Sequence, residues 1–169
     1  MYYDDEPEII SKSEIKRQMT ALQKLGEKLL ELSPKQLARV PMSEKLAEAI
    51  ETAKRINHHE GKRRQMQYIG KLMRSEDGEA INVVIQQIED GNKALTRAFQ
   101  QLENWRDRLI AEGEGAIGDI AAEYPDIDRQ HLRQLIRNAQ REASQNKPPA
   151  SARKLFKYLR ETYEASLED

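Results

Sequence analysis

The segment from Gly61 to Ser75, GKRRQMQYIGKLMRS, carries five cationic side chains and no acidic one, in a chain whose net charge is only −1. Guanidinium and ammonium groups donate several hydrogen bonds to anionic oxygens and therefore bind phosphate well. We interpret this segment as a surface for a polyanion, and RNA is the most abundant polyanion in a cell. Its candidate RNA-binding residues are Lys62, Arg63, Arg64, Lys71 and Arg74.

A second set of cations follows near the C-terminus, where four arginines recur at every fourth residue: Arg129, Arg133, Arg137 and Arg141. On a helix such a row drifts by about 40° per step and stays away from the apolar side. Stacked guanidinium groups repel one another unless an anion lies along them, as a phosphate backbone does. The alternative is that Asp128, Glu142 and acids from a neighbouring helix neutralise part of the charge. Further candidate contacts are Lys147, Arg153, Lys154 and Lys157.

Charge is segregated along the chain. Residues 59–75 and 126–161 have net charges of +4 and +5, whereas residues 76–123 between them have a net charge of −7. Residues 1–10 form an acidic N-terminal arm with a net charge of −4. The near-neutral total therefore conceals two cationic patches.

The sequence has no suitable residues for several classes of function. The chain has no cysteine, which excludes disulfides, thiol catalysis and Cys-based zinc sites. His58, His59 and Glu60 lack the spacing of a metal site, and no Gly-rich phosphate loop or activated nucleophile is evident. No apolar run approaches the ~18 residues of a membrane span, and the acidic N-terminus is no secretory signal. We expect a cytoplasmic protein that is not an enzyme and has no catalytic, metal or cofactor site.

The elements that must position these cations are helices, because apolar residues recur every three or four residues throughout. In the first basic segment, Met66, Ile69 and Met73 share one face, and the opposite face holds Arg63, Arg64, Gln67, Lys71 and Arg74. Within that helix only Arg64 has an acid at favourable spacing, namely Glu60. The remaining cations have no local partner.

The helix boundaries follow from caps and breakers. Ser11 with Glu14 forms a capping-box pattern that opens a first helix running to about Leu32, and a second helix fits residues 43–56. Glycines at 113, 115 and 118 end a long helix, and Pro125 with Asp126 starts the Arg-rich one. After Pro148 and Pro149, Ser151 caps a final helix.

The long helix, expected over about residues 79–112, has apolar residues alternately four and three apart. Nine positions form this heptad seam, two of them polar: Ile81, Ile85, Ile88, Asn92, Leu95, Phe99, Leu102, Arg106 and Leu109. Such a helix spans roughly 50 Å, more than the usual diameter of a globule of this size. We therefore expect an all-α, elongated molecule with two small helical bundles, residues 11–95 and 96–165, joined by the shared long helix. A homodimeric coiled coil through the seam is the competing arrangement, and Gly91 would weaken either one.

Five blocks carry a resemblance to a known family, and they follow one another along nearly the whole chain. They are SKSEIKR (11–17), EGKRRQMQYIGKLMR (60–74), LENWRDRLI (102–110), DRQHLRQLIRNAQRE (128–142) and NKPPASARKLFKYLRE (146–161). In these blocks the chain resembles the bacterial dual-action ribosomal maturation protein family, also called the YjgA-like family.

The resemblance implies a cytoplasmic, non-enzymatic assembly factor with an all-helical, elongated fold. It implies binding to 23S ribosomal RNA in late precursors of the large (50S) ribosomal subunit, at the interface side, and a role in folding the peptidyl-transferase region. We expect a monomer with no DNA or membrane partner. From the residues alone, the alternative is a helical protein-binding adaptor that uses the seam, with the cations as a solubilising surface.

Overall fold

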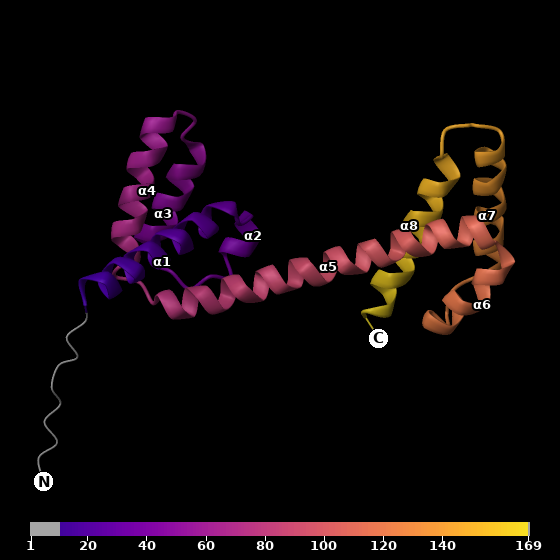
Figure 1. The fold of residues 1–169 in the computed structure, drawn as a ribbon, viewed down its shortest axis with the longest axis horizontal. Coiled ribbons are helices and arrows are strands. Elements are labelled where there is room, and N and C mark those ends of the chain that lie inside the picture. Colours follow the sequence, from indigo (N-terminus) through magenta and orange to yellow (C-terminus); the bar gives the residue numbers. More distant parts are fainter. Residues whose placement is uncertain (1–10, 169) are drawn as a thin grey trace, which may run out of the picture. The chain divides into compact units, whose positions relative to one another are not determined.

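The structure is a computed structural model that describes residues 11–168, so the acidic arm predicted for residues 1–10 lies outside the described residues. Between residues 11 and 168 the ordered elements are all helices, and no strand occurs there (Figure 1). The helices are α1 (Lys12–Glu31), α2 (Pro34–Leu37), α3 (Glu44–Arg55), α4 (His59–Met73), α5 (Gly78–Glu112), α6 (Glu114–Glu123), α7 (Arg129–Ser144) and α8 (Ala150–Ser166). The predicted all-α class is confirmed. In this part of the chain no helix is both long and apolar enough to cross a membrane.

Polar caps fix most of the helix starts. The Ser11 hydroxyl accepts a hydrogen bond from a backbone N–H group in the first turn of α1, as the sequence predicts. The Ser43 hydroxyl does the same in the first turn of α3. Asp128 caps α7 by accepting from two backbone N–H groups. The cap of α4 is His58, whose Nδ1 accepts from the Gly61 N–H at 3.0 Å. This histidine therefore has a structural role at the helix start.

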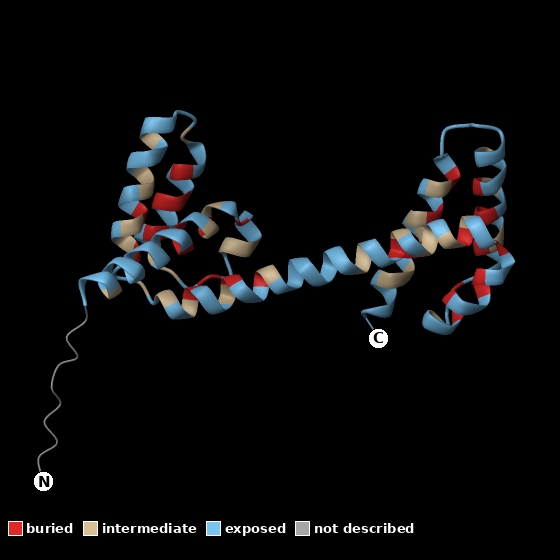
Figure 2. Ribbon diagram, viewed as in Figure 1, coloured by how far each residue is buried: buried red, intermediate tan, exposed pale blue. Residues whose placement is uncertain are grey.

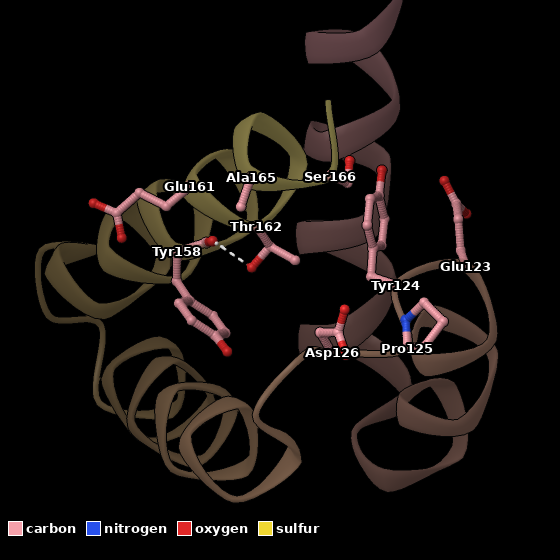
Figure 3. A pocket seen from close by; sticks show the side chains of 9 residues that line it. All are labelled: Glu123, Tyr124, Pro125, Asp126, Tyr158, Glu161, Thr162, Ala165 and Ser166. Atoms are coloured by element: carbon pink, nitrogen blue, oxygen red, sulfur yellow. Dashed lines mark hydrogen bonds between the residues drawn. The ribbon is translucent and has the colours of Figure 1, made fainter. Parts of the chain in front are cut away.

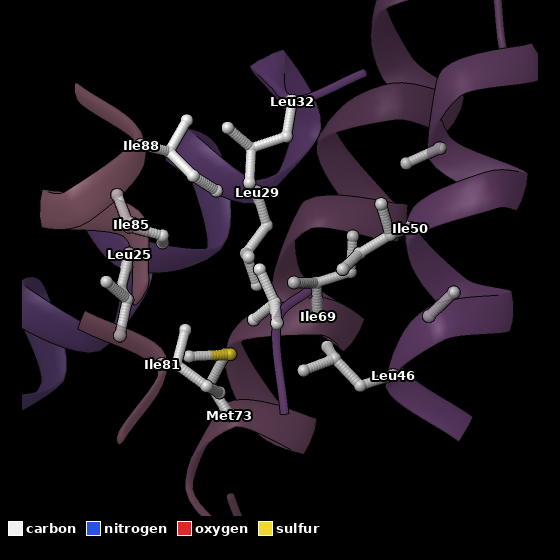
Figure 4. Packing of buried hydrophobic residues seen from close by; sticks show 13 residues of the cluster. Leu25, Leu29, Leu32, Leu46, Ile50, Ile69, Met73, Ile81, Ile85 and Ile88 are labelled. Atoms are coloured by element: carbon white, nitrogen blue, oxygen red, sulfur yellow. The ribbon is translucent and has the colours of Figure 1, made fainter. Parts of the chain in front are cut away.

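The described residues form two compact units, divided between Gly91 and Asn92. In the first unit, α1 and α3 both pack on α4, and the first turns of α5 complete the core. Figure 4 shows this core, in which Leu29, Leu46, Ile50 and Ile69 are fully buried. Burying each such side chain contributes about 1.5–3 kcal/mol, so this packing positions α4 and the cations on its other side.

The second unit holds α6, α7, α8 and the C-terminal part of α5. Its fully buried side chains include Leu109, Ile120, Leu132 and Leu155, one from each of these helices. Helix α7 packs on both α6 and α8. The buried face of α7 contains Leu132, Leu135, Ile136 and Ala139, as its periodicity predicts.

Helix α5 runs from Gly78 to Glu112, one residue longer than predicted, and continues through Gly91. Its heptad seam is buried at both ends, with Ile81, Ile85 and Ile88 in the first core and Leu102 and Leu109 in the second. Residues 90–97 are exposed, and Figure 2 shows this exposed stretch of α5 between its two sets of buried residues. The elongated two-bundle arrangement stays a prediction.

Three details of the sequence interpretation are wrong. Gly115 and Gly118 do not end a helix but lie inside α6, which was not predicted, and only Gly113, with φ +63°, separates α5 from α6. Helix α7 begins at Arg129 rather than at Pro125, because the Asp128 side chain supplies the cap. Ser151 is not the cap of α8 but lies within its first turn. There its backbone N–H donates a hydrogen bond to the carboxylate of Glu142 on α7.

Candidate nucleic-acid interface

Helix α4 presents its cations on the face that points away from the first core. Ile69 and Met73 are fully buried and Met66 is half-buried. The predicted opposite face is exposed at every position: Arg63, Arg64, Gln67, Lys71 and Arg74. No acidic residue interrupts this surface between Gly61 and Ser75.

Lys62 is exposed but does not belong to this face. It precedes Ile69 by seven residues, about two helical turns, and so lies on the same side of α4 as the buried Ile69. The five predicted cations of α4 therefore divide into four on one face and one outside it.

Glu60 neutralises part of the α4 face. Arg63 binds it with two hydrogen bonds, Nη2 to Oε1 at 2.8 Å and Nε to Oε2 at 3.2 Å, and Arg64 Nε lies 3.4 Å from Oε1. The prediction that only Arg64 pairs with Glu60 is thus wrong, because the i,i+3 geometry suits Arg63 better. Hydrogen bonds from Arg63 and then Arg64 hold the pKa of Glu60 below its ordinary value of 4.5. Within residues 11–168, Lys71 and Arg74 form no ion pair.

A groove lies between α1 and this cationic face, with a volume of about 440 Å³. Met19, Leu22 and Gln23 line it from α1, and the α4 side is lined by Arg63, Met66, Gln67, Gly70, Lys71 and Arg74. We call it the α1–α4 groove. It combines three cations with the side chains of two methionines and a leucine, so its lining is both basic and apolar.

Helix α7 carries the second cationic surface. A shallow hollow of about 520 Å³ is lined by Arg133, Arg137 and Arg141 together with the carboxamides of Gln130, Gln134 and Asn138. We call this surface the α7 face, and no carboxylate lines it. Arg129, the first residue of the predicted row, is exposed but precedes the buried Ile136 by two turns and lies outside the face.

The acid that pairs with the arginine row comes from α6. Arg133 Nε lies 2.6 Å from Glu114 Oε1. The sequence alternative named acids of a neighbouring helix together with Asp128 and Glu142, and Glu114 is such an acid. Asp128 instead caps α7 and Glu142 bonds to Ser151. In the described residues Arg137 and Arg141 form no ion pair, so they are the available charges of the α7 face.

The turn between α7 and α8 is held by Glu142. Its carboxylate accepts hydrogen bonds from the Ser151 N–H and Oγ, both at 2.7 Å. These two bonds are the main reason that the pKa of Glu142 is lowered, and the charges of Lys154 and Lys147 add to the effect. Both lysines are exposed, but the same carboxylate already attracts them.

The remaining predicted contacts lie on α8. Arg153 is exposed and forms no ion pair among residues 11–168, whereas Lys157 Nζ lies 3.8 Å from Glu161 Oε1. Helix α8 therefore offers a more mixed surface than the α7 face.

Two aromatic residues are candidates for base stacking. Trp105 is packed against the second core, its Nε1 donates to Glu123 Oε2 at 3.1 Å, and Arg108 covers its ring at 5.2 Å. Tyr68 is 47% exposed and lies beside the α4 face. Of the two, only Tyr68 presents a free ring.

The second unit also contains a hollow of opposite character, about 310 Å³ in volume (Figure 3). Glu123, Tyr124 and Asp126 line one side, and Tyr158 and Glu161 of α8 line the other. Burial, followed by the charge of Glu123 and a hydrogen bond with it, raises the pKa of Tyr124 to about 12. Three carboxyl side chains make this hollow unsuitable for a phosphate.

Two of the three histidines have structural contacts. His58 caps α4, and His131 packs edge-on against Tyr158 with ring centroids 4.7 Å apart. Among the described residues no group of three or more His, Cys, Asp or Glu side chains could hold a metal ion.

Residues 8–160 match the family model described as "Dual-action ribosomal maturation protein DarP". A protein of this name from Vibrio vulnificus (strain YJ016) is 46% identical over 166 residues, which cover 98% of this chain and 89% of the relative. Relatives of the same name from Aliivibrio fischeri (strain MJ11) and Yersinia pseudotuberculosis serotype O:1b (strain IP 31758) are 47% and 49% identical over 163 residues. These cover 95% of this chain and 92% and 89% of the relatives. The match over most of the chain means that it belongs to the family of dual-action ribosomal maturation proteins, DarP.

Proposed function

We propose that this protein is a ribosome maturation factor that binds 23S ribosomal RNA in late precursors of the large subunit, at their interface side. There it promotes maturation of the peptidyl-transferase region. Family membership and the names of the relatives support the ribosomal assignment. The single observation that carries the RNA contact is the α7 face, where three arginines and three carboxamides line a hollow without any carboxylate.

The chemistry of the two cationic surfaces suits a phosphate backbone. Guanidinium groups bind phosphate oxygens in pairs, and carboxamides add neutral donors between them. Contacts of this kind fix position and orientation without specifying base sequence. Structured ribosomal RNA offers such phosphates along its helices, where proteins recognise mainly shape and backbone.

We rank the candidate contacts by whether each cation already has a carboxylate partner. The strongest candidates lack an ion pair in the described part of the chain: Lys71, Arg74, Arg137 and Arg141. A second rank must first leave a carboxylate or share one: Arg63, Arg64, Arg133, Lys147, Lys154 and Lys157. Arg153 forms no ion pair with the described residues but lies on the mixed surface of α8. Lys62 and Arg129 lie outside both faces and serve as matched controls.

The test is sedimentation of a tagged copy from a bacterial lysate through a sucrose gradient at moderate and at high salt. Counterion release makes phosphate binding strongly salt-dependent, so we expect co-migration with large-subunit precursors that high salt removes. The K71Q/R137Q variant removes one cation from each face and should shift the protein toward the top of the gradient. The K62Q/R129Q variant has the same charge and should sediment like the wild type. Migration at the top of the gradient for the wild type at both salts would refute the proposal.

The homodimeric coiled coil has less support than the RNA-binding function. Of the nine seam positions, Ile81, Ile85, Ile88, Leu102 and Leu109 are already buried in the chain's own cores. Pairing through the seam would have to open both cores or rely on residues 90–97. An adaptor that binds through its seam would meet the same obstacle.

A further inference from the structure

We propose that the α1–α4 groove holds an unpaired ribonucleotide, with its base against the apolar lining and its flanking phosphates on Lys71 and Arg74. Such binding rests on the RNA-binding function proposed above and divides it between two surfaces of different chemistry. The α7 face is lined by arginines and carboxamides alone, which suits backbone phosphates. The α1–α4 groove adds the apolar side chains of Met19, Leu22 and Met66, which suit a base.

The apolar lining calls for a partner that a phosphate backbone does not supply. Met19 is 41% exposed, and Leu22 and Met66 are half-buried. In an RNA duplex the bases are stacked inside, so a docked duplex would leave these side chains uncovered, whereas an unpaired base can lie flat on a protein surface. Thioethers adapt to irregular shapes and make favourable contacts with aromatic rings, so a lining with two methionines accepts any of the four bases.

The groove lies where α1 and α4 open beside a close contact. At Gly26 of α1 a Cβ would lie 3.0 Å from Cγ2 of Ile69 on α4. Met19 lies seven residues earlier, about two turns, on the same side of α1, and lines the groove. The α4 lining runs from Arg63 to Arg74, about 16 Å along the helix. The volume of about 440 Å³ falls within the range of small-molecule sites, so the groove admits a base with its sugar.

The wall of the groove is bare backbone at Gly70. This glycine is internal to α4, where it weakens the helix relative to alanine. A Cβ there would meet no atom within 4 Å, so packing against the described residues does not require a glycine. The missing side chain lets a flat ring approach the helix closely.

The polar side chains of the groove suit the other parts of a nucleotide. Lys71 and Arg74 are exposed and form no ion pair with residues 11–168, so both are available to phosphate oxygens. The carboxamides of Gln23 and Gln67 line opposite walls. Because a carboxamide has both donors and an acceptor, it can form hydrogen bonds with the edge of a base.

The test follows the methionine methyl groups of the full-length protein, labelled with carbon-13, by NMR. Three probes are added: a single-stranded RNA octamer with all four bases, the same octamer annealed to its complement, and an octamer of abasic units. Ring currents of a stacked base should shift the Met19 and Met66 signals with the single-stranded octamer, and far less with the other probes. Met42, which lines a separate hollow beside α3, should not shift. The single-stranded octamer should bind about twofold to tenfold more tightly than the abasic one, the range of one thioether–aromatic contact.

A matched pair of variants separates the groove from its charge. G70L fills the groove without changing any charge, so it should abolish the RNA-induced shifts of Met19 and Met66 and the preference for the octamer with bases. Its salt-dependent binding of the duplex should persist. G91L is the control, because Gly91 is another helical glycine with no atom within 4 Å of a Cβ and lies outside the groove.

The outcomes distinguish the base site from the function on which it rests. Equal shifts and equal affinity with the abasic octamer would overturn the base site and leave the proposed RNA binding intact. The absence of salt-dependent binding to all three probes and to large-subunit precursors would overturn both. Shifts of Met19 and Met66 that appear with rising protein concentration and without RNA would assign the groove to a second copy of the chain instead.

Discussion

Glu142 and Ser151 are joined by two hydrogen bonds, from the Ser151 N–H and from its hydroxyl, each 2.7 Å long. The pair closes the turn through Pro148 and Pro149 and fixes the start of α8 against the end of α7. The carboxylate also occupies the N-terminal turn of α8, where the helix dipole favours a negative charge. Ser151 is 7% exposed, so the hydroxyl depends on this partner for its hydrogen bond.

We predict that the Glu142–Ser151 contact makes stability depend on pH in the acidic range. The pKa of Glu142 is lower in the folded than in the unfolded chain, so its contribution is fully present above its ordinary value of 4.5. The contribution is lost as the pH falls through the lowered folded pKa. Thermal unfolding of E142Q should show a lower midpoint than the wild type at pH 7 and a smaller difference at acidic pH. S151A should behave in the same way, and an unchanged difference across this range would contradict the assignment.

The α7 face predicts a change in the salt dependence of binding. R137Q/R141Q removes the two arginines of that face that have no ion pair in the described residues. Each phosphate contact contributes about one unit to the slope of log K against log salt, so the slope should fall by about two units. Titration of purified large-subunit precursors at several salt concentrations measures it. R129Q changes the charge on the same helix and should leave the slope within experimental error.

We predict that replacing Glu60 raises the affinity for large-subunit precursors. Its carboxylate holds Arg63 and Arg64, so E60Q frees both guanidinium groups for phosphate. Binding to the same precursors should tighten and its salt slope should steepen, although losing an acid from the first turn of α4 slightly weakens the helix. E51Q is the control, because it breaks the comparable Glu51–Arg55 pair of α3, away from the α4 face. Equal or weaker binding by E60Q would remove Arg63 and Arg64 from the interface.

The sequence predicted the helices with strong periodicity and clear caps, and it failed where a cap or partner came from elsewhere in the chain. Ser11 and Ser43 cap the helices that directly follow them, a relationship visible in a few consecutive residues. Helix α6 was not predicted, because three glycines close together in the sequence indicate the end of a helix. Burial of Ile117 and Ile120 in the second core stabilises this helix nevertheless. Tertiary packing overrides a propensity difference of about 1 kcal/mol per glycine.

For the candidate site, the sequence identified the cations but not which of them are available. Lys62 lies outside the α4 face and Arg129 outside the α7 face, because each precedes a core isoleucine by seven residues. This relationship is visible in the sequence. The pairing of Arg133 with Glu114 is not visible there, because the acid lies nineteen residues earlier on the unpredicted α6. The groove between α1 and α4 also required the packing of two distant helices.

We predict that alanine has opposite effects on stability at two helical glycines, Gly26 and Gly91. A Cβ at Gly26 would lie 3.0 Å from Cγ2 of Ile69, a fully buried side chain that its β-branch keeps rigid. G26A should therefore lower the free energy of unfolding by about 1 kcal/mol or more. Gly91 is exposed within α5 and has no atom within 4 Å, so G91A should raise it by about 0.5–1 kcal/mol. Denaturant unfolding measures both changes, and a loss of stability in G91A would indicate that the glycine has a further role.

The seam of α5 gives a prediction that separates intrachain packing from dimerisation. Leu95 is 47% exposed and Leu102 is 1% exposed, although both are apolar seam positions of one helix. L102A should cost about 2–5 kcal/mol, because it leaves a cavity in the second core, whereas L95E should change stability by less than about 0.5 kcal/mol. In a coiled-coil dimer Leu95 would be a buried contact, and a glutamate there would place like charges opposite each other. Sedimentation equilibrium of the wild type and L95E, at concentrations that span the dimer range, should give the same mass for both. A larger mass for the wild type alone would establish the seam as an interface between chains.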